Sequence, residues 1–390
     1  MAATIRAQDA TDRLYMQAHE AENAGKFPLA ISIWDKVIAG NPSDETAWFN
    51  RGAVHDRNNE PDKALADYTE ALGLDPSDAD AYASRASIYL EKKDRDKAFD
   101  DYASMVRVRP DVKSYETRAS AFRQLHDYKS AILDYNELVR LEPDLDRYYS
   151  YRGYTYSVLG EWDKAFDDYD HIIAMEPNSF AGYQYRGEAY SRKGDFEKAI
   201  ADFDVMLKLE PNQVYLYGLR ARAYLHTGDY DKALADADAT TRLATDWVPS
   251  LIVRGDVYAA TGKYDKAAEQ YNYVITRQPG NWGGYNSLAW FYATCPKDEV
   301  RNGAKAMELA EKACELSQWN DPPCIDTLAA AYAESGKWDE AVKFQKMAVE
   351  TGKSRESPEW EMKQFISRVA LYEQQKPYRE IPAPPRENKP

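Results

Sequence analysis

The chain has 390 residues and carries 65 acidic against 50 basic side chains, a formal net charge of −15. This acidic balance argues against a general affinity for nucleic acid or anionic lipid, because both require clustered Lys and Arg. Apolar residues make up 44% and aromatic residues 13% of the chain, which excludes wholesale disorder. No apolar run is long enough to span a membrane, and three cysteines are too few for a disulfide scaffold.

A repeat of 33 or 34 residues runs through most of the chain. Proline marks it at Pro42, Pro76, Pro110, Pro143, Pro177, Pro211 and Pro279, with Thr245 in the skipped place. Alanine, glycine and aromatic residues recur on the same period. Each repeat therefore predicts two amphipathic helices that approach closely at a small residue, with an aromatic ring beside that contact.

The pattern resembles the tetratricopeptide repeat, whose motif places Trp, Gly, Ala, aromatic and Pro residues at fixed positions. Residues 45–78 supply Trp48, Gly52, Ala64, Tyr68, Ala71 and Pro76 at those positions. Ten such units begin at residues 11, 45, 79, 112, 146, 180, 214, 248, 282 and 322. The resemblance implies an all-α, right-handed solenoid of about ten helix hairpins over residues 11–353.

The remaining segments are interpreted from local signals. Residues 1–10 are an N-terminal extension, frayed at the entry to the first helix, and the Pro-rich tail 376–390 is expected to be extended or disordered. Residues 357–374 predict a capping helix, with Ser357 as N-cap and Pro358 in the first turn. Units nine and ten have Ala310 and Gln345 in place of an aromatic, so we expect their second helices to pack thinly.

Arginine recurs at repeat position 7, where the family usually has leucine, and aspartate recurs at repeat position 23. In an antiparallel helix pair the two positions lie at equal distance from the turn, so each Arg is expected to pair with the Asp of its own unit. We interpret this ladder as structural. Its predicted pairs are Arg51 with Asp67, Arg85 with Asp101, Arg118 with Asp134, Arg152 with Asp168, Arg186 with Asp202 and Arg220 with Asp236.

Motifs for chemistry are scarce. The five histidines fall at different repeat positions without metal-ligand spacing, and no catalytic motif occurs, so we expect no metal, no cofactor and no enzyme activity. A less favoured alternative is an enzyme, or an enzyme accessory, with a site at the insertion near Cys295–Asn302. Cys314 and Cys324 fall at adjacent helix ends, so a disulfide is conceivable, but buried free thiols are the simpler interpretation.

The resemblance implies that the first helix of each unit lines a concave groove. A mixture of aromatic, Arg and amide side chains suits an extended or helical peptide. The candidate groove residues are Phe49, Asn50, Arg123, Tyr151, Tyr154, Gln184, Tyr185, Glu188, Arg192, Tyr215, Arg222 and His226.

We therefore expect a non-catalytic scaffold or adaptor whose partners are other proteins or peptide segments, not nucleic acid. A structural protein that self-assembles through thinly packed units is the alternative. The first 13 residues have no apolar core of a signal peptide. We therefore expect a cytoplasmic protein from the sequence as written; a periplasmic or secreted protein that has lost its signal peptide would have the same sequence.

Overall fold

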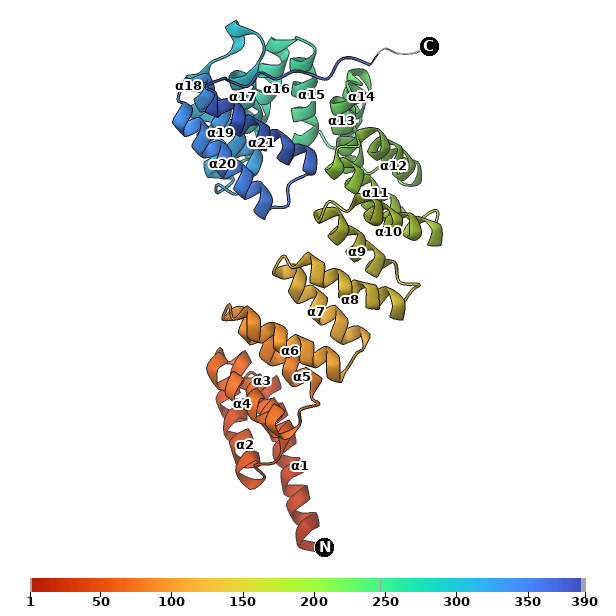
Figure 1. Cartoon of the computed structure of the whole chain (residues 1–390), viewed down its shortest axis with the longest axis vertical. Coiled ribbons are helices and arrows are strands. Elements are labelled where there is room, and N and C mark those ends of the chain that lie inside the picture. The colour runs from red at the N-terminus through yellow and green to blue at the C-terminus, as the bar shows by residue number, and fades with distance from the viewer. Residues whose placement is uncertain (1, 246, 387–390) are drawn as a thin grey trace. The chain divides into compact units, whose positions relative to one another are not determined.

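The computed structural model describes residues 2–245 and 247–386, with side chains described from residue 10 onward, and within them every regular element is a helix (Figure 1). The chain divides after Tyr148 into two bodies, each described here by itself. The first body holds α1 (Ala2–Asn23), α2 (Phe27–Gly40), α3 (Glu45–Arg57), α4 (Pro61–Leu74), α5 (Ala79–Glu91), α6 (Arg95–Val108), α7 (Val112–Gln124) and α8 (Tyr128–Leu141).

The second body contains the rest of the array and the C-terminal segment. Its helices are α9 (Asp146–Val158, which begins three residues before the division), α10 (Trp162–Met175), α11 (Phe180–Lys193), α12 (Phe196–Leu209), α13 (Val214–Thr227), α14 (Tyr230–Leu243), α15 (Val248–Ala260), α16 (Tyr264–Arg277), α17 (Trp282–Thr294), the short 3-10 helix η1 (Asp298–Val300), α18 (Gly303–Leu316), α19 (Pro322–Glu334), α20 (Trp338–Ser354) and α21 (Glu359–Glu373).

Odd-numbered and even-numbered helices form hairpins, in which the odd-numbered helix is called A and the next helix B. The two helices of a hairpin pack on each other, and in the second body the A helices α13, α15, α17 and α19 also contact one another in order. The fold is therefore an all-α solenoid of helix hairpins. Helix α1 already includes residues 2–10, so the N-terminal extension continues the first helix.

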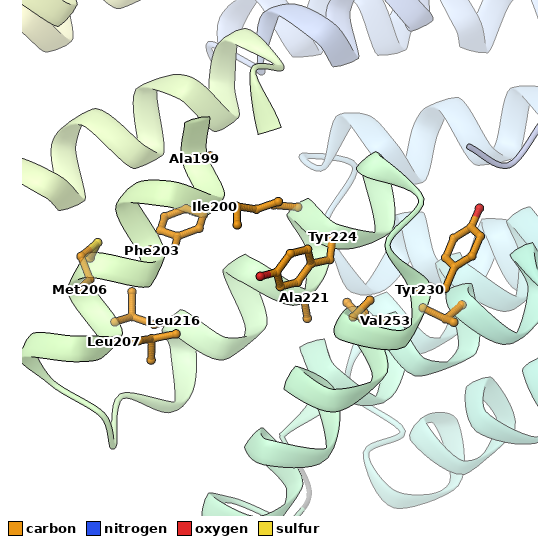
Figure 2. Close-up of a cluster of buried hydrophobic side chains, with 13 residues drawn as sticks. Ala199, Ile200, Phe203, Met206, Leu207, Leu216, Ala221, Tyr224, Tyr230 and Val253 are labelled. Carbon is orange, nitrogen blue, oxygen red and sulfur yellow. The ribbon is translucent and has the colours of Figure 1, made fainter. Parts of the chain in front are cut away.

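Part of the core of the second body extends from one hairpin into the next. One buried cluster joins α12, α13, α14 and α15, with Phe203, Met206 and Leu216 fully buried in it (Figure 2). Small residues allow the helices to approach. A Cβ on Gly255 of α15 would lie 2.4 Å from the ring of Tyr271 on α16. The periodic small and aromatic residues therefore meet at the helix crossing, as close packing requires.

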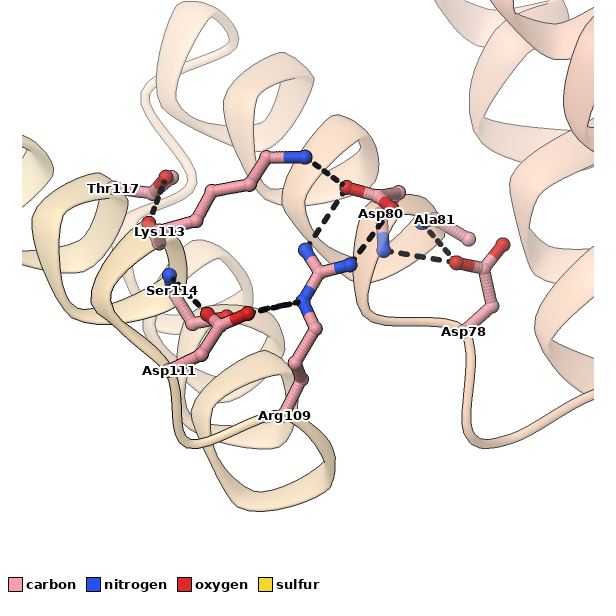
Figure 3. A network of polar contacts seen from close by, with 8 residues as sticks. All are labelled: Asp78, Asp80, Ala81, Arg109, Asp111, Lys113, Ser114 and Thr117. Atoms are coloured by element: carbon pink, nitrogen blue, oxygen red, sulfur yellow. Dashed lines mark hydrogen bonds and ion pairs between the residues drawn. The ribbon is translucent and has the colours of Figure 1, made fainter.

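Polar contacts between consecutive hairpins add to this packing in the first body. Asp78 caps α5 by accepting bonds from the backbone N–H groups of Asp80 and Ala81 (Figure 3). The Asp80 carboxylate accepts two bonds from Arg109, at 2.9 and 3.0 Å, and one from Lys113 at 2.8 Å. Because Arg109 and Lys113 flank the start of α7, this network ties α5 to the next hairpin.

The C-terminal region differs in two respects from the sequence expectation. Helix α21 begins at Glu359 with Pro358 as N-cap, so Ser357 lies one residue outside the cap. The last hairpins are also not thinly packed, because Gln345 is fully buried. Its amide donates to Asp326 at 2.7 Å and to the carbonyl of Phe365 in α21 at 3.1 Å. A polar contact with α21 therefore fills the place of the missing aromatic ring.

Candidate functional site

Six Arg–Asp pairs form a ladder inside consecutive hairpins, and each is bidentate. In every pair Nε of the Arg donates to Oδ2 of the Asp and Nη2 donates to Oδ1, over 2.6 to 3.0 Å. All six Asp side chains are buried. Burial raises the pKa of Asp202, an effect that the Arg186 guanidinium opposes. These pairs join helix A to helix B and leave no carboxylate of the ladder exposed for a ligand.

Four of these arginines, Arg51, Arg85, Arg186 and Arg220, also reach back to the preceding hairpin, a contact that the repeat motif does not show. Nη1 of Arg51 donates to Asp35 at 2.6 Å, and Nη1 of Arg186 binds Asp170. Arg254, whose own hairpin has no matching Asp, binds Asp238 and also donates to the Thr241 hydroxyl at 3.3 Å. Within each body, the arginines of the ladder thus also join neighbouring hairpins.

The predicted groove residues divide between the two bodies. In the first body, Phe49 lies 5.6 Å from the ring of Tyr68 as part of a small core cluster. Asn50 and Arg123 are half-buried on α3 and α7. The other nine residues belong to the second body.

Two of these nine hold the loop that precedes α21. The Tyr154 hydroxyl donates to the Glu356 carboxylate at 2.6 Å, and Arg192 donates to the Glu356 backbone carbonyl at 2.7 Å. The Arg192 guanidinium lies 5.9 Å from the centroid of the Tyr154 ring. Its Nε is buried and has no hydrogen-bond partner among the described residues. The predicted groove therefore already binds a stretch of backbone, and it retains a buried donor.

A third predicted groove residue, His226, lies in an aromatic cluster with the first turn of α21. Its ring stacks on Phe196 at 4.2 Å and meets Trp360 edge-on at 4.8 Å. Burial lowers the pKa of His226 to about 4, so the ring is neutral near pH 7. Next to this cluster, the Trp162 indole donates to Glu359 at 2.6 Å. Helix α21 thus contacts helices α10 to α13 as well as α20, whereas the sequence predicted only a cap on the last hairpin.

The remaining predicted groove residues are more open. Tyr151 is 41% exposed, and Glu188 and Arg222 are also exposed. Gln184 donates to Glu188 at 2.9 Å along α11. Gln184 is half-buried, as are Tyr215 and Tyr185, whose ring stacks against Tyr169 at 6.1 Å.

The segment 376–386, here called the arm, is extended and lies against α17 through its first half (Figure 1). Glu380 accepts a bond from the Trp290 indole at 3.0 Å, and its backbone N–H donates to the carbonyl of Thr294 at 2.9 Å. The guanidinium of Arg368 lies 4.4 Å from the Tyr378 ring and 4.7 Å from the Trp290 ring. An aromatic residue and an acid of the arm are therefore both held at the end of one A helix.

The second half of the arm lies on the turn between α13 and α14. The Tyr230 hydroxyl donates to the Ala383 carbonyl, and the backbone N–H of Arg386 donates to the Gly228 carbonyl at 3.1 Å. The Arg386 side chain pairs with Glu197 at 2.7 Å. The four last residues of the predicted tail, 387–390, lie outside the described residues.

Two acids near the C-terminal segment have raised pKa values. Burial raises the pKa of Asp256, on α15, to about 6, and the nearby Glu380 adds to this effect. The Tyr271 hydroxyl, which donates to Asp256 at 2.6 Å, and the Arg222 charge oppose it. Burial also raises the pKa of Glu361, on α21, to about 7. Burial therefore makes both acids easier to protonate than usual where the C-terminal segment contacts the A helices.

The insertion of unit nine is a braced surface loop. The side chains of Lys297 and Asp298 are 51% and 87% exposed. Arg301 fixes the loop by binding Asp298, Glu334 and the Cys295 carbonyl. Burial raises the pKa of the Cys295 thiol, which disfavours a nucleophilic thiolate. Nothing in this geometry favours the enzyme site suggested for the insertion.

All three cysteines are buried and free in the structure, which has no disulfide between Cys314 and Cys324. Burial raises the pKa of Cys314 to about 12 and that of Cys324 further. In the part of the chain that the structure describes, no group of His, Cys, Asp and Glu could hold a metal ion. None of the described helices is long and apolar enough to cross a membrane.

Comparison with known proteins gives a family match and several distant structures. Family models of the tetratricopeptide repeat match residues 15–79, 54–111 and 186–246, residues 168–201, and residues 112–145 and 248–281. Among the curated proteins, none matches the chain.

Similar solved structures include that of yeast Tom70, 15% identical, which covers 94% of this chain and 96% of that one at a TM-score of 0.49. A tetratricopeptide repeat protein from Parabacteroides merdae is 17% identical over 78% of this chain and 99% of its own, at a TM-score of 0.37. YrrB, described as having an unusual peptide-binding site, is 23% identical over 47% of this chain and 95% of its own, at a TM-score of 0.38.

Proposed function

We propose, from the premise that this chain belongs to the tetratricopeptide repeat family, that it is a non-catalytic scaffold that binds a segment of a partner protein. Arrays of this family generally serve interactions between proteins. The proposed site is the face of α9, α11 and α13 that carries Tyr151, Tyr154, Tyr185, Arg192 and Arg222, here called the groove.

One observation carries the proposal: the groove already holds a piece of chain. Tyr154 and Arg192 bind the side chain and the backbone carbonyl of Glu356, and the ring of His226 packs against Trp360. A surface that binds a carbonyl and a carboxylate through a phenol and a guanidinium has the chemistry for a peptide.

The rest of the groove supports the same proposal. Arg192 keeps a buried Nε donor without a partner among the described residues, and an unpaired buried donor favours any ligand that brings an acceptor. Exposed Tyr151 on α9 provides an aromatic ring, and exposed Arg222 on α13 provides a positive charge. Tyr and Arg are the residues that most often dominate binding energy at protein interfaces.

The test compares two variants as baits for partners in a native lysate. The first carries Tyr151→Ala, Tyr154→Ala and Tyr185→Ala, and the control carries Tyr273→Ala on α16. Tyr273 is 40% exposed on a B helix, so its truncation removes a similar ring away from the groove. We expect the triple variant to lose a partner that wild type and the control retain, since loss of one central Tyr costs about 2 kcal/mol or more.

Circular dichroism of each bait shows whether it is folded. If folded wild type and triple variant retain the same partners, the groove is not the binding site. If wild type returns only further copies of itself, self-association replaces the adaptor function.

A further inference from the structure

The arm occupies a surface outside the groove, on the turns that join A helices to B helices. Two of its backbone N–H groups donate to the carbonyls of Thr294 and Gly228, which are the last residue of α17 and the C-cap of α13. The last carbonyls of a helix have no partner within the helix. An extended chain can therefore pair with one helix end after another, whatever its side chains are.

Gly228 shows that this surface is shaped for a close backbone. It has φ of +75°, and a Cβ at this position would lie 2.1 Å from the carbonyl oxygen of Pro384. Gly262, the matching residue after α15, also has φ of +75°, but among the described residues no atom lies within 4 Å of the place of its Cβ. Two glycines with the same left-handed backbone conformation thus differ in their contact with the arm.

The arm is held by contacts that separate easily from the fold. Ile381 in its middle is 84% exposed, and none of the arm side chains belongs to the fully buried core. Helix α21 differs, because its Phe365, Arg368 and Tyr372 are buried. The arm can therefore leave while α21 stays in place. Segments with few buried contacts open at a low free-energy cost.

The chemistry of the occupied surface is acidic and that of the arm is basic. The arm contains Lys376, Arg379 and Arg386 against one acid, Glu380. Arg379 pairs with Glu334 at 2.7 Å and Arg386 with Glu197 at 2.7 Å. Four prolines, at 377, 382, 384 and 385, hold the arm extended and reduce the entropy that it loses on docking.

We propose that the surface formed by Glu197, Gly228, Tyr230, Trp290, Thr294 and Glu334, here called the arm surface, is an exchange site for a partner protein. Its ligand is an extended, basic, proline-containing segment with one acid two residues after an aromatic residue, the pattern of the arm. This proposal rests on the proposed function, because it names a kind of partner segment for the scaffold. The arm is then a tethered competitor that the partner displaces.

The probe is a fluorescently labelled peptide with the sequence of residues 376–386, whose binding to the full-length chain is followed by anisotropy. In wild type the tethered arm competes at an effective concentration in the millimolar range. The combined change Tyr378→Ala and Glu380→Ala weakens the arm and leaves the arm surface intact. For a peptide with a Kd of about 100 µM, the released variant should bind about tenfold more tightly than wild type.

Matched changes in the released variant locate the site. Adding Gly228→Ala should abolish binding, because the new Cβ occupies the place of the peptide backbone. Adding Gly262→Ala should leave the Kd unchanged, although both substitutions put the same strain on a left-handed turn. A peptide with all four prolines replaced by Ala should bind several-fold more weakly, since it is no longer held extended.

Three results would overturn the proposal. One is equal peptide affinity of wild type and the released variant, and another is equal affinity with Gly228→Ala and Gly262→Ala. The third is dimerisation of wild type that depends on concentration, is measured by light scattering and disappears in the released variant. Such dimerisation would show that the arm surface binds the arm of a second copy of this chain. The triple variant with Tyr151→Ala, Tyr154→Ala and Tyr185→Ala should keep the arm docked and should bind the peptide as wild type does. Loss of lysate partners in that variant therefore tests the groove, whereas the peptide assay tests the arm surface.

Discussion

Removal of one carboxylate from the Arg–Asp ladder should destabilise the array locally. Asp202 is 3% exposed and accepts two bonds from Arg186, at 3.0 and 2.6 Å. Deleting one partner of a buried ion pair costs about 3–5 kcal/mol. Because Arg186 is 23% exposed and keeps its bond to Asp170, the lower end applies to Asp202→Ala, about 3 kcal/mol.

A matched variant sets the scale for this effect. Asp238 also binds an arginine of the ladder, Arg254, but its side chain is 56% exposed. Exposed pairs contribute about 0.2–1 kcal/mol, so Asp238→Ala should cost no more than that. The double change of Arg186→Met with Asp202→Leu should recover most of the stability, because an apolar pair of similar volume removes the buried unpaired charge.

Amide hydrogen exchange read by mass spectrometry is the assay, since an array of repeats does not unfold in a single step. About 3 kcal/mol corresponds to a protection loss of about 100-fold in α11 and α12 for Asp202→Ala. The loss for Asp238→Ala should stay below about sixfold in α14 and α15. Equal losses in the two variants, or no loss near Asp202, would refute the view that the buried pairs act as struts.

Three further predictions follow from particular contacts. The raised pKa values of Asp256 and Glu361 stabilise the docked C-terminal segment below about pH 4, and this stabilisation is lost as pH rises through 6 to 7. Hydrogen-exchange protection of α21, corrected for intrinsic rates, should therefore fall over that range, and it should fall less in Asp256→Asn. Constant protection would contradict this prediction. Gly255→Ala should destabilise α15 and α16 by about 1–3 kcal/mol, because its Cβ meets Tyr271, and unchanged exchange there would show that the ring can move. The thiols of the native protein should not react with iodoacetamide at pH 8, since Cys314 and the other two cysteines are buried. All three thiols should react in urea. Fast labelling of the native protein would contradict their burial.

The period of the sequence was sufficient to predict the repeat fold. Pro, Ala, Gly and aromatic residues at intervals of 33 or 34 report contacts within one hairpin, and those contacts are local in sequence. The Arg and Asp positions are 16 residues apart within one hairpin, so their pairing follows from helix geometry alone. The bond from Arg186 back to Asp170 depends on how one hairpin stacks on the next, which no single repeat reveals.

Contacts between distant parts of the chain were not predictable from the repeat. Trp247 fills the space over Gly218, where a Cβ would lie 2.2 Å from its ring, in a unit that has Ala237 at the aromatic position. The arm was predicted only as an extended or disordered tail, because proline content indicates backbone shape and not a binding site. Its contact from Glu380 to Trp290 crosses 90 residues and depends on the path of the whole second body.

Limited trypsin digestion tests directly whether the C-terminal segment lies on the turns that follow the A helices. The Arg379–Glu380 bond is cleavable only when the arm leaves the protein surface, because Arg379 is paired with Glu334 and the next residue is bonded to Thr294 and Trp290. We predict that cleavage after Arg379 is faster in Gly228→Ala than in wild type and that Gly262→Ala, with the same turn strain, keeps the wild-type rate. Equal rates in all three proteins would contradict the docked arm.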